Sequence, residues 1–249
     1  MTEELIVQRR GGVAVLTINR PHRRNALGDA LIAELRSTFA KLEVDSSVGS
    51  VVLTGCAPGF CAGSDLKELG SMTLDDMCAH ESRTASFCRE LGLVRMPVIA
   101  AVEGFALGGG FVLAASCDVV VSGQSTRWSL PEVEIGWIPP WGLETLVGRV
   151  GSARARQLTW GGMPFDGAEA YRLGLADHLA QDGGVLEHAC EIAAVLAQLP
   201  PESVASTKLY FATVGARDKE GGDRLATQMF KENCGHSKAK ATLSKFGMK

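Results

Sequence analysis

The segment from Gly104 to Asp118, GFALGGGFVLAASCD, constrains the fold of this chain more than any other. It follows a short apolar run, Pro97–Val102, whose β-branched and small residues predict a buried strand. Three glycines, Gly108 to Gly110, then lead into an apolar stretch that predicts a buried helix. Glycines permit a sharp turn and a close approach to the main chain, and the start of a helix leaves N–H groups unpaired. The segment either turns the chain inside a crowded core or offers its amides to a developing anion.

Two glycine-rich nucleotide motifs do not fit this turn. A phosphate-binding P-loop requires a Lys-Ser or Lys-Thr pair after its last glycine, where this chain has Phe111 and Val112. A dinucleotide fingerprint requires the spacing G-x-G-x-x-G, which three consecutive glycines do not provide. Neither motif therefore explains the turn.

The composition argues against several classes of function. A net charge of −3 and a pI near 6.0 give no electrostatic support for binding nucleic acid or an anionic membrane. No apolar run approaches the roughly 20 residues of a membrane helix, and the start MTEELIVQRR lacks the apolar core of a signal peptide. The seven cysteines form neither a CxxC pair nor a disulfide framework. We therefore expect a soluble, cytoplasmic protein with reduced thiols and with no nucleic-acid or membrane partner.

Hydrophobic periodicity predicts strands mainly in the first half of the chain and helices in the second. A hairpin is predicted around Gly11 and Gly12, amphipathic helices over Leu27–Val44 and Leu74–Val94, and one long projecting helix over Gly222–Phe246. Further helices are predicted at Leu143–Val150, Ala153–Trp160, Asp166–Leu173, Val185–Leu199 and Pro201–Ala212. The pattern predicts an α/β core over residues 1–195 followed by a helical region over residues 196–249.

Three motifs together carry a family resemblance. They are FCAGSDLKEL (Phe60–Leu69), GFALGGGFVLAASCD (Gly104–Asp118) and PEVEIGWIPP (Pro131–Pro140). In this order and spacing they resemble the crotonase family, the enoyl-CoA hydratase/isomerase superfamily, and the resemblance covers nearly the whole chain. It implies an α/β spiral of ββα units with a helical C-terminal trimerisation region. It also implies an acyl-CoA substrate, no cofactor beyond the coenzyme A of that substrate, and a homotrimer or a dimer of trimers.

The resemblance also implies the residues of the site. The backbone N–H groups of Ser64 and Gly109 would form an oxyanion hole for the thioester oxygen, which agrees with the properties of the glycine-rich helix start. Lysines of the C-terminal region are expected on a solvated helix face, with one of them left open as a partner of the coenzyme A phosphates: Lys231, Lys238, Lys240 and Lys245. The substrate-binding positions implied are Arg24, Ala26, Ala62, Asp65, Leu66, Gly108, Val112 and Trp137, and the first five of these have ordinary loop packing as their alternative.

A departure from the family's hydratase pattern bears on the chemistry. Family hydratases carry one glutamate shortly after the triple glycine and another in the Pro-Glu motif; this chain has Val112 at the first position and Glu132 at the second. Pro140 stands where other members carry a working aspartate. A single carboxylate beside an oxyanion hole favours Δ3-Δ2-enoyl-CoA isomerisation through an enolate, with Glu132 as the acid and base. The surrounding Trp128, Trp137, Ile138 and Trp141 are expected to raise the pKa of Glu132 by desolvation.

Several alternatives stay open. A hydratase-lyase of the hydroxycinnamoyl-CoA type would use a tyrosine from the C-terminal helix, but the only tyrosines, Tyr171 and Tyr210, are poorly placed for that role. A plain hydratase would need a second functional group. His80 and Glu81 are the spare titratable residues, but their helix positions are expected to face solvent. Glu134 is a weak alternative base. A non-catalytic acyl-CoA binder is a further possibility, and the acidic balance disfavours an RNA-binding role.

Overall fold

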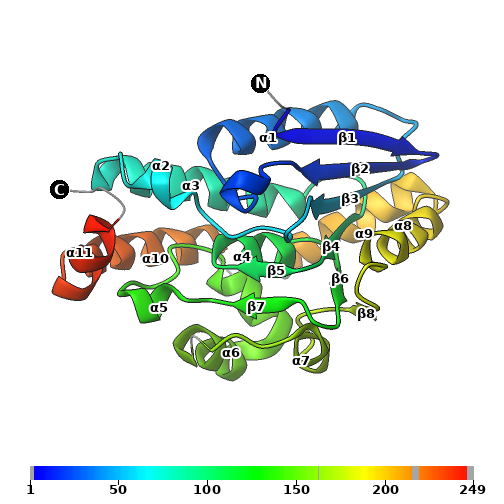
Figure 1. Ribbon diagram of the computed structural model, residues 1–249. Coiled ribbons are helices and arrows are strands. Elements are labelled where there is room, and N and C mark those ends of the chain that lie inside the picture. The colour runs from blue at the N-terminus through cyan, green and yellow to red at the C-terminus, as the bar shows by residue number, and fades with distance from the viewer. Residues whose placement is uncertain (1–2, 162, 215–218, 246–249) are drawn as a thin grey trace.

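A computed structural model describes residues 3–161, 163–214 and 219–245, and its centre is a six-stranded sheet (Figure 1). The strand order is β1-β2-β3-β4-β6-β8. β1 and β2 form the predicted antiparallel hairpin, and the other neighbouring strands are parallel. The strands span Leu5–Arg10 (β1), Val13–Ile18 (β2), Ser50–Gly55 (β3), Val98–Val102 (β4), Val119–Gly123 (β6) and His178–Ala180 (β8).

A second, two-stranded parallel sheet carries the chain toward the glycine turn. It pairs β5 (Phe105–Leu107) with β7 (Arg127–Ser129). The sequence did not predict β5, because three residues next to a glycine run are too short to show the two-residue period of a strand. This small sheet delivers the chain from β4 to α4 (Gly109–Ala115), the buried helix predicted after the triple glycine.

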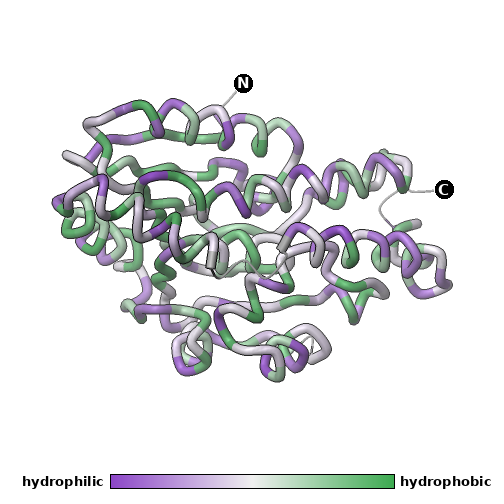
Figure 2. Tube along the Cα trace, turned by 180° about the vertical axis from the view of Figure 1, so that it is seen from behind, coloured by the Kyte–Doolittle hydropathy of each residue, from purple (hydrophilic) through white to green (hydrophobic). Residues whose placement is uncertain are grey.

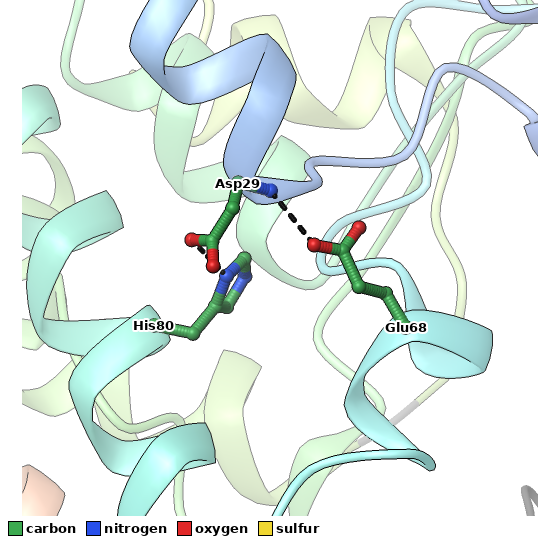
Figure 3. Close-up of side chains that lie close together, drawn as sticks. All are labelled: Asp29, Glu68 and His80. Atoms are coloured by element: carbon green, nitrogen blue, oxygen red, sulfur yellow. Dashed lines mark hydrogen bonds and ion pairs between the residues drawn. The ribbon is translucent and has the colours of Figure 1, made fainter.

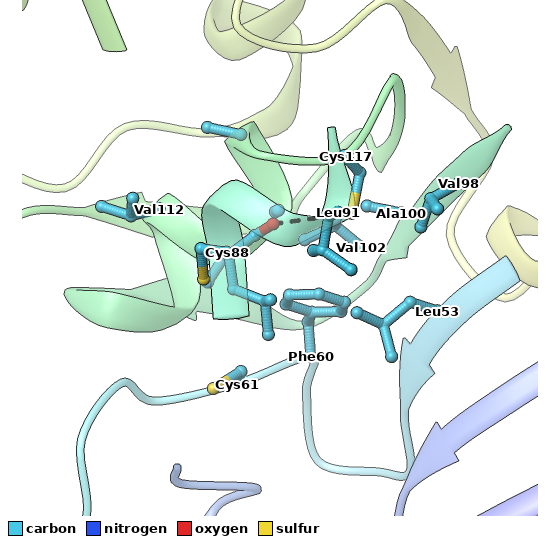
Figure 4. Close-up of a cluster of buried hydrophobic side chains, with 14 of the residues drawn as sticks. Leu53, Phe60, Cys61, Cys88, Leu91, Val98, Ala100, Val102, Val112 and Cys117 are labelled. Atoms are coloured by element: carbon cyan, nitrogen blue, oxygen red, sulfur yellow. Dashed lines mark hydrogen bonds between the residues drawn. The ribbon is translucent and has the colours of Figure 1, made fainter. Parts of the chain in front are cut away.

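The central strands of the main sheet, β2, β3, β4 and β6, are buried on both faces, which is why they read as nearly continuous apolar runs. One face packs against α8 (Val185–Leu196) through alternate residues of the central strands: Val13, Val15, Val52, Ile99, Ala101 and Val121. The opposite face belongs to the larger core, which includes residues of α1 (Asp29–Glu43), α3 (Leu74–Leu91), α4 and α6 (Leu143–Gly161). Figure 4 shows part of that core. Phe60 and Leu53 lie near residues of β4, and Val112 of α4 lies farther to the left in this view. The core thus fixes α4 against the sheet.

The two helices expected at Leu143–Val150 and Ala153–Trp160 are both present within α6, which is broken between them at Gly151, whose backbone is not helical (φ +75°, ψ 157°). Another predicted helical region differs from the structure. The single helix expected over Gly222–Phe246 was wrong: α10 (Lys219–Cys234) and α11 (Ser237–Ser244) are separate, and Phe246 lies outside the described residues. Gly235 has low helix propensity and His236 has an extended backbone (ψ 157°), so the chain turns there.

The C-terminal helices pack on the body of the chain and do not project from it. α10 contacts α3 and α6, and α11 contacts α10 and α5 (Glu132–Ile135), as Figure 1 shows at the end of the molecule where α11 lies. Trp137 meets Phe230 of α10 edge to face at 5.7 Å. The other helices are η1 (Pro21–Arg23), α2 (Leu66–Leu69), α7 (Gly167–Arg172) and α9 (Pro201–Val214). In Figure 2 the helices near the C-terminus mix hydrophilic and hydrophobic positions, as expected for elements with one face on the body.

Candidate active site

The main chain at Ser64 is fixed on both sides. Leu27 pairs with this segment through two hydrogen bonds, from the Leu27 N–H to Gly63 O (2.8 Å) and from the Asp65 N–H to Leu27 O (2.9 Å). The Asp65 carboxylate then caps α2 by accepting from the N–H groups of Lys67 and Glu68. Within the described part of the chain, the Ser64 N–H has no acceptor of its own. It is therefore a free donor held on a rigid segment.

Gly109 presents a second free donor. The turn before it is anchored by hydrogen bonds from Leu107 N to Cys61 O (3.0 Å) and from Gly108 N to Ser129 O (2.9 Å). Gly108 has φ +53°, a conformation that favours glycine. As the first residue of α4, Gly109 has an N–H with no intrahelical partner, and among the residues described it donates no hydrogen bond to another group.

The two segments lie so close that a side chain would separate them. Gly63 has φ +86°, and a Cβ built on it would lie 2.9 Å from the Gly109 nitrogen. A Cβ built on Gly109 would lie 3.6 Å from the Ser64 nitrogen. Two unpaired N–H donors on adjacent segments that border one cavity can bind an oxygen that gains negative charge during a reaction.

That cavity has a volume of about 90 Å³ and gathers most of the predicted site. Eight of the eleven predicted residues line it: Ala62, Ser64, Leu66, Gly108, Gly109, Val112, Glu132 and Trp137. The other three lie outside its lining. Arg24 places its guanidinium 4.6 Å from the Phe105 ring centroid, Ala26 is buried, and Asp65 is buried and bonded to Arg20 as well as to α2. Their role toward coenzyme A stays a prediction.

Glu132 is the chemically unusual group in the cavity. It begins α5, is only 8% exposed, and its Oε2 is buried with no hydrogen-bond partner. Burial, together with a smaller effect of the negative charge of Glu81, raises the pKa of the Glu132 carboxyl to about 7. The carboxylate also lies against the glycine turn, because a Cβ on Gly108 would come within 2.8 Å of Glu132 Oε1. Glu132 can therefore take up and release a proton near neutral pH beside the two free amides.

The apolar setting of Glu132 differs in part from the prediction. Trp137 and Trp141 line the cavity with Pro139 and Pro140. Trp128 does not line it: its ring is fully buried against Phe111 at 5.3 Å, and its Nε1–H donates to Ser122 Oγ. Ile138 also lies outside the cavity lining. The predicted rise in the pKa of Glu132 is confirmed, but two of the four residues invoked for it lie elsewhere.

The sequence interpretation of His80 and Glu81 was wrong. Both were expected to face solvent, but their exposed fractions are 1% and 4%. Glu81 lines the cavity, where it accepts hydrogen bonds from Ser64 Oγ (2.8 Å) and from Trp141 Nε1 (2.6 Å). A signal was present in the sequence, because Glu81 falls on the helical stripe of Met77, Thr84 and Cys88, all of which are buried.

His80 belongs to a separate cluster, shown in Figure 3. His80 Nδ1 lies 2.9 Å from Asp29 Oδ1, and Glu68 accepts from the Asp29 N–H at the start of α1. The positions of Asp29, Glu68 and His80 are close enough for metal ligands, but Arg83 already pairs with Asp29 at 2.8 Å. These contacts tie α1, α2 and α3 together.

The remaining candidates lie away from the chemistry. Glu134 is exposed on the side of α5 away from the cavity, so the turn of the helix separates it from Glu132. Tyr171 and Tyr210 are exposed. The four C-terminal lysines do not line the cavity, and Lys231 pairs with Asp75 on α3. Cys61 was not among the predicted site residues. Its carbonyl anchors the glycine turn, and burial raises the pKa of its thiol to about 12, so it is not an ionised nucleophile at neutral pH.

The arrangement of a buried carboxyl beside two unpaired main-chain N–H groups is suited to an enzyme site, and comparison with known proteins gives the family. The sequence profile described as enoyl-CoA hydratase/isomerase matches residues 8–249. The chain is 32% identical over 240 residues, 96% of its length and 86% of the relative, to a probable mitochondrial enoyl-CoA hydratase of Dictyostelium discoideum. It is 36% identical over 206 residues to the 2,3-dehydroadipyl-CoA hydratase of Escherichia coli strain K12, covering 82% and 80% of the two chains.

A solved structure agrees. The crystal structure of an enoyl-CoA hydratase/isomerase from Mycobacterium paratuberculosis superposes with a TM-score of 0.87 at 26% identity and covers 98% of this chain and 99% of the other. The chain belongs to the enoyl-CoA hydratase/isomerase family, has the crotonase fold and is an enzyme that acts on acyl-CoA. Among the described residues, none of the helices has the length and apolar character to cross a membrane. Cytoplasmic location stays a prediction, since the Dictyostelium relative is named as mitochondrial.

Proposed function

We propose that this enzyme adds water to the double bond of a 2-enoyl-CoA thioester, with Glu132 as the acid and base. One observation carries the proposal: a buried carboxyl with an unpartnered oxygen and a pKa of about 7 shares a cavity with two unpaired main-chain N–H groups. Two of the relatives described above are named as hydratases, which supports hydration over the isomerisation that the sequence pattern favours.

The steps follow from the positions of these groups. The thioester oxygen accepts from the N–H groups of Ser64 and Gly109. Glu132 removes a proton from a water molecule while the oxygen of that water bonds to C3. The electron pair of the C2=C3 bond moves toward the thioester oxygen to give an enolate. The protonated Glu132 then delivers that proton to C2, which restores the carbonyl and the free carboxylate. Because the same carboxyl takes up and returns the proton, this route does without the second functional group that the sequence pattern led us to expect of a hydratase. A pKa near 7 suits this exchange, because neither form of the carboxyl is strongly favoured at neutral pH.

Isomerisation is the second candidate, and Val112 is the observation that favours it. Val112 is buried, lines the cavity and cannot hold a water molecule by hydrogen bonding. In that reaction Glu132 would remove a C2 proton from a 3-enoyl-CoA to give a dienolate, whose thioester oxygen the same two N–H groups would bind, and Glu132 would then protonate C4 as the double bond moves to C2=C3. We also propose that the enzyme assembles as a homotrimer or as a dimer of trimers.

Paired substrates separate the two reactions. The enzyme is given matched 2-enoyl-CoA and 3-enoyl-CoA thioesters in D2O, and mass spectrometry follows water addition and deuterium incorporation separately. Hydration predicts a 3-hydroxyacyl-CoA from the 2-enoyl substrate. Isomerisation predicts conversion of the 3-enoyl substrate with deuterium at carbon and no added oxygen. Tight binding of both thioesters without turnover would contradict both reactions and indicate a binding protein.

A further inference from the structure

Glu81 is a buried carboxylate that the proposed reaction does not use. Its two oxygens accept from residues on different segments, Ser64 Oγ at 2.8 Å and Trp141 Nε1 at 2.6 Å. Ser64 supplies one donor of the oxyanion hole through its own main chain. The Trp141 ring lies against the other donor residue, since a Cβ on Gly109 would come within 3.1 Å of Trp141 Cζ2. Glu81 thus joins both sides of the hole through a single carboxylate.

We propose that Glu81 is the positioning residue of the oxyanion hole, and that its bridge between Ser64 and Trp141 holds the two main-chain donors at the spacing the thioester oxygen requires. The inference rests on the proposed function, because it assigns a role to those donors. Glu81 itself does not need to contact the reacting carbons. It acts on the reaction through the residues it holds.

The cost of burying Glu81 argues against a packing role alone. A buried charge is expensive unless it is paired, and the described residues provide no cation within ion-pair distance of this carboxylate. A methionine or leucine would fill the same space without that cost. Two strong donors, one of them the buried Trp141 N–H, partly offset it. The carboxylate of Glu81 can accept from Ser64 Oγ and from Trp141 Nε1 at the same time, and an apolar side chain at this position could hold neither donor.

The charge of Glu81 also reaches Glu132. It adds to the effect of burial in raising the pKa of Glu132. Of the described residues that line the cavity, only these two ionise, because α10 and α11 contribute Phe230 and Leu243. The nearby charged groups of α3 and α10 are engaged elsewhere, as the pairs Arg89–Asp223, Lys231–Asp75 and His80–Asp29. Removing the charge while keeping the bridge should therefore move the acidic limb of the rate profile to lower pH.

Four substitutions separate the bridge from the charge. Glu81→Leu removes both. Glu81→Gln removes only the charge, since its amide oxygen can accept from Trp141 and its amide nitrogen can donate to Ser64. Ser64→Ala and Trp141→Phe each remove one arm and leave the main-chain N–H groups in place. Ser82→Ala, an exposed neighbour on α3, is the matched control.

Two measurements are made on the full chain with each variant. The first is kcat and KM against pH with the substrate that the wild type turns over. The second is the infrared C=O stretch of bound butanoyl-CoA labelled with ¹³C at the thioester carbon, which reports hydrogen bonding in the hole without any turnover. If the wild type shows no turnover, the proposed function fails, while the carbonyl frequencies still test the inference.

The bridge predicts a graded result. Glu81→Leu should lower kcat about 100-fold with little change in KM, the loss typical of one oxyanion donor, and should move the bound carbonyl frequency toward that of free thioester. Ser64→Ala and Trp141→Phe should show the same changes to a smaller degree, and Glu81→Gln should lose less than about tenfold. The inference is overturned if Glu81→Leu leaves the carbonyl frequency at the wild-type value. If Glu81→Leu does not fold, the same result in both Ser64→Ala and Trp141→Phe overturns it. A loss in Glu81→Gln as large as that in Glu132→Gln would overturn it too, because Glu81 would then transfer protons.

Discussion

Helices α3 and α5 each place one buried carboxylate at the same cavity, and the two differ in what surrounds them. Glu81, in the middle of the 18-residue α3, has hydrogen-bond donors on both oxygens. Glu132, at the start of the 4-residue α5, has one buried oxygen without any partner. Their exposed fractions, 4% and 8%, are nearly the same. The extent of burial therefore does not distinguish the two carboxylates. They differ in hydrogen bonding: Glu81 is bonded to its neighbours through both oxygens, whereas Glu132 has an unpartnered oxygen that can exchange a proton.

The largest expected effect tests the free carboxylate. Glu132→Gln removes the acid and base while keeping the shape of the side chain, so kcat should fall about 1,000-fold, in the middle of the range for general acid–base catalysis. Glu134→Gln is the matched control, because Glu134 lies two residues away on the exposed side of α5. Steady-state kinetics of both variants measure the contrast. Equal activity of Glu132→Gln and wild type would remove the distinction between the two helices.

The raised pKa of Glu132 predicts a stability effect of on the order of 3 kcal/mol. Its pKa is about 7 in the folded protein against an ordinary value of 4.5, so the folded state binds the proton more tightly. The wild type should therefore lose stability relative to Glu132→Gln as pH rises from about 4.5 to about 7, with no further change above that. Urea unfolding of both proteins across this range measures the difference. A constant difference would show that Glu132 titrates normally.

Disturbing the hole directly should have an effect of similar size. Gly63→Ala places a Cβ 2.9 Å from the Gly109 nitrogen at φ +86°, so it should separate the two donors and lower kcat about 100-fold. Gly11→Ala is the control, since Gly11 has φ +59° in the hairpin but nothing within 4 Å of the new Cβ. Both variants should lose stability, and only Gly63→Ala should lose activity. Full activity of Gly63→Ala at normal KM would indicate that the amide spacing is unimportant.

The smallest expected effect concerns the surface of α3. Lys231 and Asp75 form an ion pair whose side chains are 53% and 81% exposed, so solvent screens the pair and Lys231→Met should leave the unfolding temperature close to the wild-type value. Thermal unfolding of Lys231→Met and of the wild type measures this effect. KM for the acyl-CoA should stay at the wild-type value. A marked rise in KM would instead indicate that Lys231 binds the coenzyme A phosphates.

The parts of the fold that carry a local signal could be predicted. The hairpin at Gly11, the core strand before Gly104 and the buried helix after Gly108 follow from residue periods and glycine turns, and the structure contains all three. The three-residue β5 and the break at Gly235 carry too little periodic signal to be predicted. Hydrophobic periodicity favoured one long C-terminal helix, but the chain turns near Gly235 and α11 packs against α5 and α10.

The site could be predicted where a motif carries it and not where distant contacts make it. Glu132 stands in the Pro-Glu motif, so its apolar setting and raised pKa could be anticipated. Glu81 has partners 17 and 60 residues away along the chain, and no local pattern reveals such contacts. Its charge made a solvent-facing position the natural expectation, although its stripe on α3 is buried. The prediction for Trp128 was wrong for the opposite reason: Trp128 is close to Glu132 in the sequence, but it does not line the cavity.

The two donors that we propose for the oxyanion hole are peptide groups, and this sets what mutation and environment can do to them. No replacement except proline deletes a backbone N–H, and neither ordinary changes of acidity nor oxidants titrate or modify it. Side chains around the pocket, such as the one at Val112, can therefore be exchanged over evolutionary time while the polarising pair persists. A lineage built on this scaffold can acquire new reactions by changing what approaches the thioester without having to reinvent how the thioester is activated.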